Sequence, residues 1–201
     1  MTLSKEERRK ISAKQGRAIY GVEMKIVGGD GRDQPWDGKT YGDLLVRGPW
    51  ILQQYYKGES PLVVDEAGLG WLPTGDVATI DADGFMQITD RSKDVIKSGG
   101  EWISSIDIEN IAMGHPAVAM AACVGMAHPK WDERPIVVVA TKPGASVTRE
   151  ELLAFYEGKL AKWQIPDDVV FVDAIPLGAT GKMLKTKLRE VLVGYQLPDL
   201  R

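Results

Sequence analysis

The sequence is poor in the side chains that build disulfides and metal sites. Its 201 residues include one cysteine, Cys123, and two histidines, His115 and His128. A lone cysteine excludes an internal disulfide, and its apolar neighbours predict a small core residue rather than a nucleophile. These few side chains, at these spacings, do not match a zinc site, and we expect no metal site. A single cysteine also fits a reducing compartment, so we expect a cytoplasmic protein.

Charge of one sign and long hydrophobic runs are also missing. The formal net charge is −3, which gives no electrostatic reason to expect nucleic acid or an anionic membrane surface as a partner. The longest apolar stretch, residues 117–127, is too short to span a bilayer and is interrupted by Gly125. The charged N-terminus lacks the apolar core of a signal peptide. These absences predict a globular protein without a transmembrane segment.

The first ninety residues alternate strand-like segments with turns. A hairpin is expected around Ala-Asp-Gly, where Gly84 would supply a positive φ. A charged N-terminal arm of helical character precedes this β-rich half. The expected strands are residues 21–27, 43–47, 76–81 and 85–90.

After residue 90 the pattern becomes mixed. Ser98-Gly99-Gly100 predicts a tight hairpin, Ser105 an N-cap, and Thr148 to Glu151 a capping box. The expected strands are 94–97, 101–104, 117–126, 136–141 and 169–173, and the expected helices are 106–113, 148 to about 162 and 185 to about 195. The sequence therefore predicts an α+β chain with a β-rich part at 1–90 and a compact α+β domain at 91–201.

One loop near the C-terminus suggests phosphate chemistry. Residues 176–185 read Pro-Leu-Gly-Ala-Thr-Gly-Lys-Met-Leu-Lys. A P-loop needs glycine at the position of Pro176 and serine or threonine at that of Met183, so this loop is not a P-loop. Spacing alone favours a loop that enters the last helix, with a solvated basic face formed by Lys182, Lys185, Lys187 and Arg189.

Three segments in order narrow the interpretation. They are Trp-Leu-Pro-Thr-Gly-Asp-Val-Ala from residue 71, Asp-Arg-Ser-Lys-Asp-Val-Ile-Lys-Ser-Gly-Gly-Glu-Trp-Ile-Ser from residue 90, and the loop from residue 176. Together they resemble the C-terminal third of the adenylate-forming acid ligases, a superfamily of acyl-CoA synthetases, carrier-protein adenylation domains and beetle luciferase. Ser-Gly-Gly-Glu-Trp-Ile-Ser and Val-Arg-Gly-Pro-Trp look most like medium-chain fatty-acid–CoA ligases. The resemblance extends from about Gly16 to Leu192.

The resemblance implies roles for single residues. Asp76 would accept hydrogen bonds from the ribose hydroxyls of ATP, which suits the two oxygens of a carboxylate. Arg91 would also approach the ribose, and Asp90 would be the hinge of the small domain. From the residues alone, these three positions could equally be a strand-start aspartate, a surface ion pair and a turn.

The same resemblance assigns the two half-reactions to two loops. Lys182 would be the catalytic lysine of adenylation, while the basic-face interpretation stays for Lys185, Lys187 and Arg189. Leu177 stands where the family often has a basic residue, and Trp-Asp-Glu-Arg-Pro from residue 131 has no assigned chemistry. The hairpin that would line the CoA channel consists of Lys97, Ser98, Gly99, Gly100 and Glu101.

Several family elements do not occur in the sequence. The phosphate loop, the aromatic-Gly-x-Thr-Glu element for adenine and magnesium, and the acyl pocket are missing. We therefore expect the C-terminal fragment of an ATP-dependent fatty-acid–CoA ligase that uses ATP and CoA, is inactive alone, and leaves the Mg²⁺ ligands outside this chain. An adenylation domain for a carrier protein and a non-catalytic interaction module are the alternatives. The β-rich part, residues 1–90, would expose strand edges and could self-associate through them.

Overall fold

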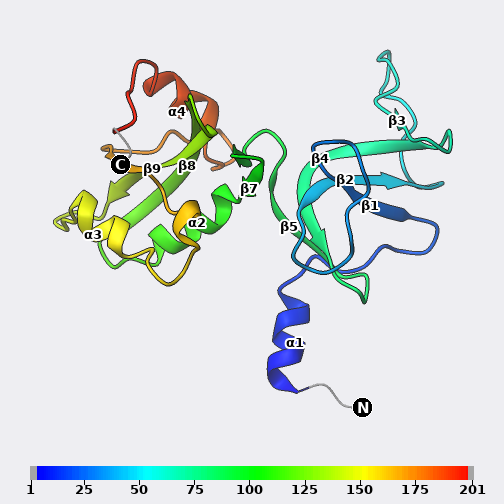
Figure 1. Ribbon diagram of the computed structural model, residues 1–201, viewed down its shortest axis with the longest axis horizontal. Helices are drawn as coiled ribbons and strands as arrows, with labels where there is room; N and C mark the ends of the chain where they lie inside the picture. Colours follow the sequence, from blue (N-terminus) through cyan, green and yellow to red (C-terminus); the bar gives the residue numbers. More distant parts are fainter. Residues whose placement is uncertain (1–3, 199–201) are drawn as a thin grey trace. The chain divides into compact units, whose positions relative to one another are not determined.

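The computed structural model describes residues 4–198 and divides into two compact units, Met1–Lys93 and Asp94–Arg201. The division lies a few residues after the boundary predicted at residue 90. No glycine or proline occurs in Asp90-Arg91-Ser92-Lys93, the stretch that ends the first unit. Each unit has its own sheet and its own core, so each is described by itself (Figure 1).

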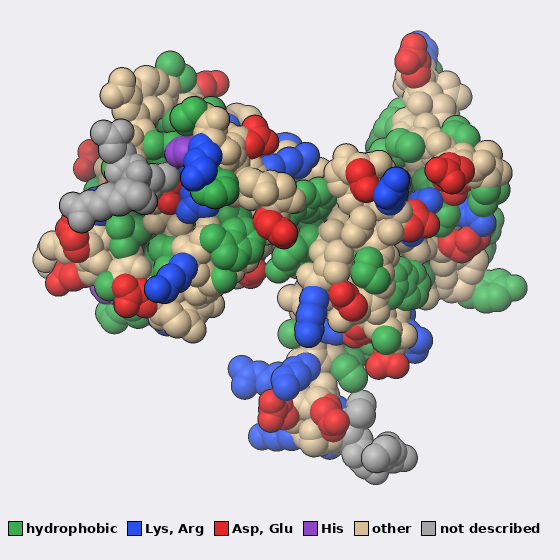
Figure 2. All heavy atoms as spheres, in the orientation of Figure 1, with side chains coloured by type: hydrophobic (Ala, Val, Ile, Leu, Met, Phe, Trp, Pro, Cys, Tyr) green, Lys and Arg blue, Asp and Glu red, His purple; other side chains and the backbone are tan. Residues whose placement is uncertain are grey.

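The first unit is a helix followed by an antiparallel sheet. Helix α1 (Lys5–Ser12) begins with a capping box between Ser4 and Glu7 and buries none of its residues. In Figure 2 charged side chains of both signs gather around this helix. The strands are β1 (Glu23–Val27), β2 (Gly42–Arg47), β3 (Val63–Val64), β4 (Gly70–Ile80) and β5 (Met86–Arg91). Their order is β1-β2-β4-β3 with β5 on β4, so the described strands form an open sheet rather than a closed barrel.

Strand β4 is the centre of this unit. It pairs with β2, β3 and β5, and it begins at Gly70, earlier than the predicted start at residue 76. Pro73 obscures this longer strand in the sequence, because proline cannot donate a ladder hydrogen bond. The β4–β5 hairpin forms around Gly84 at φ +81°, as predicted. The small core of the first unit consists of Ile26, Leu44, Ala78 and Ile80.

The second unit is built on two long strands. β8 (Val118–His128) and β9 (Asp132–Thr141) form an antiparallel hairpin, and β10 (Asp168–Phe171) lies parallel to β9. The short hairpin of β6 (Ile96–Ser98) and β7 (Glu101–Ile103) pairs with the start of β9. The helices are α2 (Ser105–Met113), α3 (Arg149–Ala154), the 3₁₀ turn η1 (Lys162–Gln164) and α4 (Lys185–Val191).

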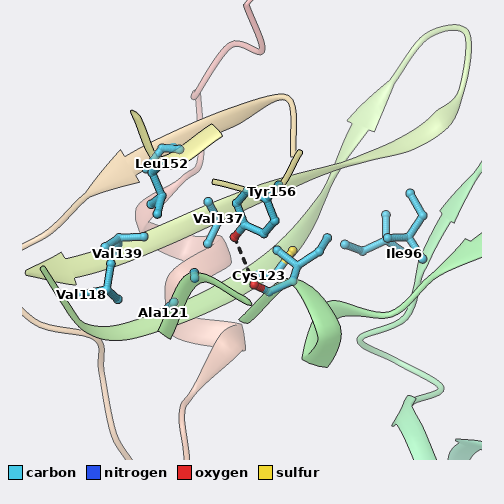
Figure 3. Close-up of a cluster of buried hydrophobic side chains, with 12 residues drawn as sticks. Ile96, Val118, Ala121, Cys123, Val137, Val139, Leu152 and Tyr156 are labelled. Carbon is cyan, nitrogen blue, oxygen red and sulfur yellow. Dashed lines mark hydrogen bonds between the residues drawn. The ribbon is translucent and has the colours of Figure 1, made fainter. Parts of the chain in front are cut away.

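Both faces of the β8–β9 hairpin are buried, which explains its continuous apolar runs. Alternate residues point to opposite faces, so neighbours such as Cys123 and Val124 belong to two separate cores. One core contains residues of α2 and α3 and includes Tyr156, whose hydroxyl donates to the carbonyl oxygen of Ile108 at 3.0 Å (Figure 3). The other core is completed by Leu188 of α4 and by Leu192.

The α+β prediction is confirmed, with three corrections at helix ends. Ser104 rather than Ser105 is the N-cap of α2, because its backbone is extended and its Oγ accepts from Asp107 N at 3.1 Å. The capping box at Thr148 is present, but α3 ends at Ala154 instead of near residue 162. Turns replace the rest of the predicted helix, including Gly158 at φ +72°. The last helix, α4, likewise ends at Val191, short of residue 195.

Candidate functional site

Lys182 stands at the end of a tight turn that leads into α4. The Gly181 amide donates to the Gly178 carbonyl at 2.9 Å, and the Gly178 amide donates to the Lys182 carbonyl at 2.8 Å. Gly181 has φ +76°, a conformation that glycine adopts without steric cost. A further bond from Leu184 N to Pro176 O, 2.9 Å, closes the base of the loop. The backbone of Lys182 is therefore held by hydrogen bonds on both sides of the turn.

The ammonium group of Lys182 is available to a ligand. The residue is exposed, and within residues 4–198 no carboxylate forms an ion pair with it. Exposed Lys187, the third residue of α4, also has no ion pair in the described part of the chain. The prediction of a solvated basic face therefore holds for these two lysines.

The same prediction is wrong for Lys185. Its Nζ lies 2.7 Å from Glu109 Oε1 and 2.6 Å from Ser105 Oγ, and the lysine and glutamate side chains are 11% and 6% exposed. Glu109 Oε1 also accepts the Cys123 amide at 2.8 Å. The first residue of α4 is thus fixed to α2 and β8 by a buried ion pair.

The basic-face prediction is also wrong for Arg189. Its side chain is partly buried, and Nη2 donates to Asp94 Oδ1 at 3.0 Å. Asp94 is the first residue of the second unit. The Arg189 side chain therefore packs back onto the chain instead of facing solvent.

Asp76 and Arg91, which the resemblance assigns to the nucleotide, are brought together by the β4–β5 ladder. They are direct cross-strand partners, and Arg91 Nη1 lies 3.1 Å from Asp76 Oδ1. The Asp76 amide donates to Thr74 Oγ1 at 3.1 Å, and Gly75 precedes it at φ +77°. The Asp76 side chain remains 20% exposed, so its carboxylate can accept further hydrogen bonds.

Asp90, the predicted hinge residue, is buried at the end of β5. It is 2% exposed, pairs with Val77 in the ladder, and accepts the Arg91 amide on Oδ1 at 2.7 Å. It lies just before the division between the two units. Hinge motions are commonly absorbed by a few residues at the end of an element, and Asp90 is the last residue but one of β5.

The residues predicted for the CoA channel form the β6–β7 hairpin. Gly99 and Gly100 occupy its turn at φ +60° and +87°, while Ser98 is buried and Lys97 and Glu101 are exposed. The Gly99 amide donates to the Trp131 carbonyl at 2.8 Å. The hairpin therefore lies against the turn between β8 and β9.

A cavity of about 430 Å³ opens beside this hairpin. Its walls come from the hairpin, from the β8–β9 turn and β9, and from the segment before β10. The lining residues are Ser98, Gly99, Glu101, Trp131, Arg134, Trp163 and Asp167. Arg134 and Asp167 were missed by the sequence analysis. Their signal was the charged Trp-Asp-Glu-Arg-Pro stretch, in which a buried arginine could not be recognised without its distant partner.

A second buried carboxylate lies next to this segment. Asp168 accepts hydrogen bonds from the Arg149 side chain, from the Tyr195 hydroxyl and from the Val169 amide. Burial opposes its charge, but these bonds outweigh burial and hold the pKa of Asp168 below its usual value. Burial, followed by the nearby Asp168 carboxylate, raises the pKa of Tyr195 to about 12. This cluster ties the chain after α4 to β10.

Two features are absent from the described residues. Between residues 4 and 198, no helix combines the length and the apolar character that crossing a membrane requires. In the same range, no group of three or more His, Cys, Asp or Glu side chains could hold a metal ion.

The fold and these loops identify the class of protein. Residues 107–182 match the family of the AMP-binding enzyme C-terminal domain. The chain therefore contains this domain and is a homologue of the adenylate-forming acyl-CoA ligases, so the resemblance found in the sequence is confirmed.

Individual relatives agree with this assignment. The chain is 57% identical over 92% of its length to the 3-methylmercaptopropionyl-CoA ligase of Ruegeria pomeroyi, and 46% identical over 94% to the medium-chain-fatty-acid–CoA ligase of Ectopseudomonas oleovorans. It covers 34% of each, so it spans about a third of the length of these relatives.

Solved structures show the same architecture. ATP-bound MatB from Rhodopseudomonas palustris matches with a TM-score of 0.75 at 29% identity, over 90% of this chain and 36% of that one. The o-succinylbenzoate CoA synthetase of Bacillus subtilis, in complex with its acyl-adenylate, matches with 0.75 at 32% identity over 94% of this chain and 38% of that one. The roles of the individual site residues remain predictions.

Proposed function

We propose that this chain supplies the ribose contacts, the adenylating lysine and the CoA-channel hairpin of an ATP-dependent carboxylate–CoA ligase. The observation that carries the proposal is the exposed ammonium of Lys182, which forms no ion pair among residues 4–198, on a hydrogen-bonded turn of an AMP-binding enzyme C-terminal domain. In the first half-reaction a carboxylate oxygen attacks the α-phosphorus of ATP, and pyrophosphate leaves. In the second, the CoA sulfur attacks the acyl carbonyl, the thiol proton is lost, and AMP leaves.

Lys182 would stabilise the first transition state. Negative charge gathers there on the α-phosphate and on the attacking oxygen, and an ammonium group placed between them lowers the barrier and aligns the reactants. Lysine is suited to this as a compact charge on a long stem. Because no carboxylate of the described chain neutralises Lys182, its full charge would be available to the phosphate.

Asp76 and Arg91 would hold the ribose. One oxygen of Asp76 contacts Arg91, which orients the carboxylate and leaves further acceptor positions for the two hydroxyls. The Arg91 side chain is 55% exposed and can also reach a ligand. This pair is formed by two adjacent strands, so its geometry would be set before the nucleotide arrives.

Asp90 would act as the hinge between the two half-reactions. It is the last residue but one of β5, and the second unit begins at Asp94. Rotation at one or two residues here would change which loop of the second unit faces the reacting atoms. We propose that one orientation presents Lys182 for adenylation and another presents the hairpin of residues 97–101 for thioester formation.

The acid would be a small or medium-length carboxylic acid with an apolar chain. Two relatives support this range by name, one acting on 3-methylmercaptopropionate and one on medium-chain fatty acids. Octanoate and 3-methylmercaptopropionate are therefore the first acids to compare. The Mg²⁺ that accompanies ATP would be held by residues outside this chain.

A chimera tests the proposal. This chain replaces the matching third of the Ruegeria pomeroyi ligase, to which it is 57% identical. We expect acid-dependent pyrophosphate exchange and CoA-thioester formation in the chimera. Lys182→Ala should lower the adenylation rate by about a hundredfold to a thousandfold, as expected for loss of a charge that stabilises a transition state. Lys187→Ala is the matched control, because it removes an exposed lysine from the same segment.

Each outcome has a clear meaning. Equal effects of the two lysine variants would refute the catalytic role of Lys182. A chimera that adenylates acids but transfers them only to a carrier protein would favour a carrier-protein adenylation domain. A chimera without any adenylation, beside an active parent ligase, would favour a non-catalytic interaction module.

The chain alone should be inactive and should self-associate. Its phosphate and acyl sites are missing, so no acid-dependent pyrophosphate release is expected from the 201 residues by themselves. The first unit exposes several large apolar side chains, among them Ile19, Tyr20, Trp50, Tyr56 and Val64. Sedimentation velocity should therefore show concentration-dependent association of the whole chain. A monomer at all concentrations would contradict this part of the proposal.

A further inference from the structure

The β6–β7 hairpin cannot fix its own position. Each of its strands has three residues, and both turn positions are glycines with positive φ. An isolated two-stranded hairpin is marginally stable at best in water. The place of residues 97–101 therefore depends on the groups that contact them.

Several of those contacts come from the turn between β8 and β9 and from the start of β9. The Gly99 amide donates to Trp131 O at 2.8 Å, and the Lys97 amide donates to Glu133 Oε2 at 3.0 Å. A Cβ atom at Gly99 would lie 2.9 Å from the Trp131 ring, so the ring packs directly on the hairpin backbone. These contacts hold one side of the hairpin.

Arg134, a buried residue of β9, contacts the hairpin through Ser98. The arginine is 8% exposed and its Nη1 donates to Ser98 Oγ at 3.1 Å. Nε and Nη2 form a two-pronged ion pair with Asp167, at 2.8 and 2.7 Å. The last two bonds go to the carbonyl oxygens of Trp163, 2.7 Å, and Ile165, 3.3 Å. The guanidinium group thus makes five hydrogen bonds with its five N–H groups.

Arg134 therefore differs from residues that could bind a ligand. Because every donor is used within the protein, the guanidinium has none left for CoA. It instead joins the hairpin to the segment 163–167, and both of these line the cavity beside Glu101. Lysine at this position could not reproduce the planar, two-pronged contact with Asp167.

We propose that Arg134 is a positioning residue for the thioester half-reaction. It sets the hairpin of residues 97–101 at a fixed distance from residues 163–167, so that this wall of the CoA channel is formed before CoA arrives. The inference rests on the proposed function of that hairpin. In the proposed function adenylation depends on Lys182, and the five hydrogen bonds of Arg134 go to Ser98, Asp167 and the carbonyls of Trp163 and Ile165 rather than to the loop of Lys182. Arg134 therefore affects the second half-reaction selectively.

The first test uses Arg134→Lys in the chimera described above. Acid-dependent pyrophosphate exchange measures adenylation, and CoA-thioester formation from preformed acyl-adenylate measures the second step. We expect thioester formation to fall by about tenfold to hundredfold, through kcat and the KM for CoA, since small misplacements of positioning groups cost this much. Pyrophosphate exchange should fall by less than about threefold. Arg149→Lys is the control, because it alters another arginine–aspartate pair of the same unit.

A second test does not need activity. Hydrogen exchange is measured on the 201-residue chain for the backbone amides of residues 96–103. Arg134→Lys and Asp167→Asn should both speed exchange of the Lys97 and Gly99 amides, whereas Arg149→Lys should not. The Asp167 variant keeps the arginine and its bond to Ser98, so it isolates the ion pair.

The outcomes separate this inference from the proposed function. A wild-type chimera without thioester formation contradicts the proposed function, and hydrogen exchange then decides whether Arg134 positions the hairpin. In an active chimera, a parallel fall of both half-reactions would show a merely structural arginine and would overturn the inference. Unchanged thioester formation, or unchanged exchange at Lys97 and Gly99, would also overturn it.

Discussion

The buried ion pair between Lys185 and Glu109 allows a sharp test by Lys185→Met. Methionine keeps an unbranched apolar side chain but removes the ammonium group that contacts Glu109 at 2.7 Å and Ser105 at 2.6 Å. The Glu109 carboxylate, in a side chain 6% exposed, would keep its bond from the Cys123 amide but lose the ammonium of Lys185. Loss of the ion pair at a buried carboxylate is therefore the expected defect.

The size of the effect follows from the burial of both partners. Removing one partner of a buried ion pair costs about 3–5 kcal/mol. We expect the lower end, about 3 kcal/mol, because the Cys123 amide still stabilises the carboxylate. For a domain of this size, 1 kcal/mol shifts Tm by about 4–8 °C, so the Tm of the second unit should fall by about 12 °C or more.

Thermal unfolding followed by circular dichroism measures this effect on the whole chain. The double variant Glu109→Gln/Lys185→Met should recover most of the loss, since it removes both charges and keeps a carbonyl acceptor for the Cys123 amide. Lys187→Met is the control and should change stability by less than about 0.5 kcal/mol, because that side chain is exposed. A double variant that is less stable than Lys185→Met would refute the reasoning. A Lys185→Met variant with the same Tm as the wild type would refute it too.

Two further predictions concern the tail and the hairpin. The pKa of Tyr195 is raised from its usual 10.0 to about 12, so its contribution to stability is complete below pH 10 and is lost as pH rises toward 12. Chemical denaturation should therefore show the gap between wild type and Tyr195→Phe closing over this range, and a constant gap would contradict the Asp168 contact. Gly99→Ala should destabilise the hairpin more than Gly100→Ala, because only the former meets the Trp131 ring while both strain a positive φ. Equal thermal shifts of the two variants would contradict this packing.

The turns, the capping box and the long strands could be predicted from the sequence, because each depends on residues close together in the chain. Gly84 and the Gly99-Gly100 pair mark turns that need positive φ, and Thr148 with Glu151 forms the predicted capping box. The two apolar runs of β8 and β9 predicted buried strands for the same reason. Such features depend on neighbours a few residues apart.

The contacts that fix the site were not accessible in this way. Lys185 meets Glu109 across 76 positions of sequence, and Arg134 meets Asp167 across 33. In both cases a charged residue beside other charged residues predicts a solvated surface, and only the tertiary fold supplies the opposite charge that allows burial. The family resemblance predicted a role for Lys182 but carried no information about the contacts that hold its loop and α4.

The two faces of the β8–β9 hairpin are covered by helices of different stability. The less stable one is α4, and the loop of Lys182 leads directly into it. Helix α4 has seven residues, too few to persist alone, so it remains folded only while Leu188 and Leu192 pack on the sheet and Lys185 pairs with Glu109. The opposite core, with Tyr156, contains no residue of α4. Partial opening of this chain should therefore begin at α4, releasing the lysine loop while most of the domain stays intact. The loop of Lys182, the proposed adenylating residue, would then be the first part of the unit to be lost on heating and the last to form on refolding.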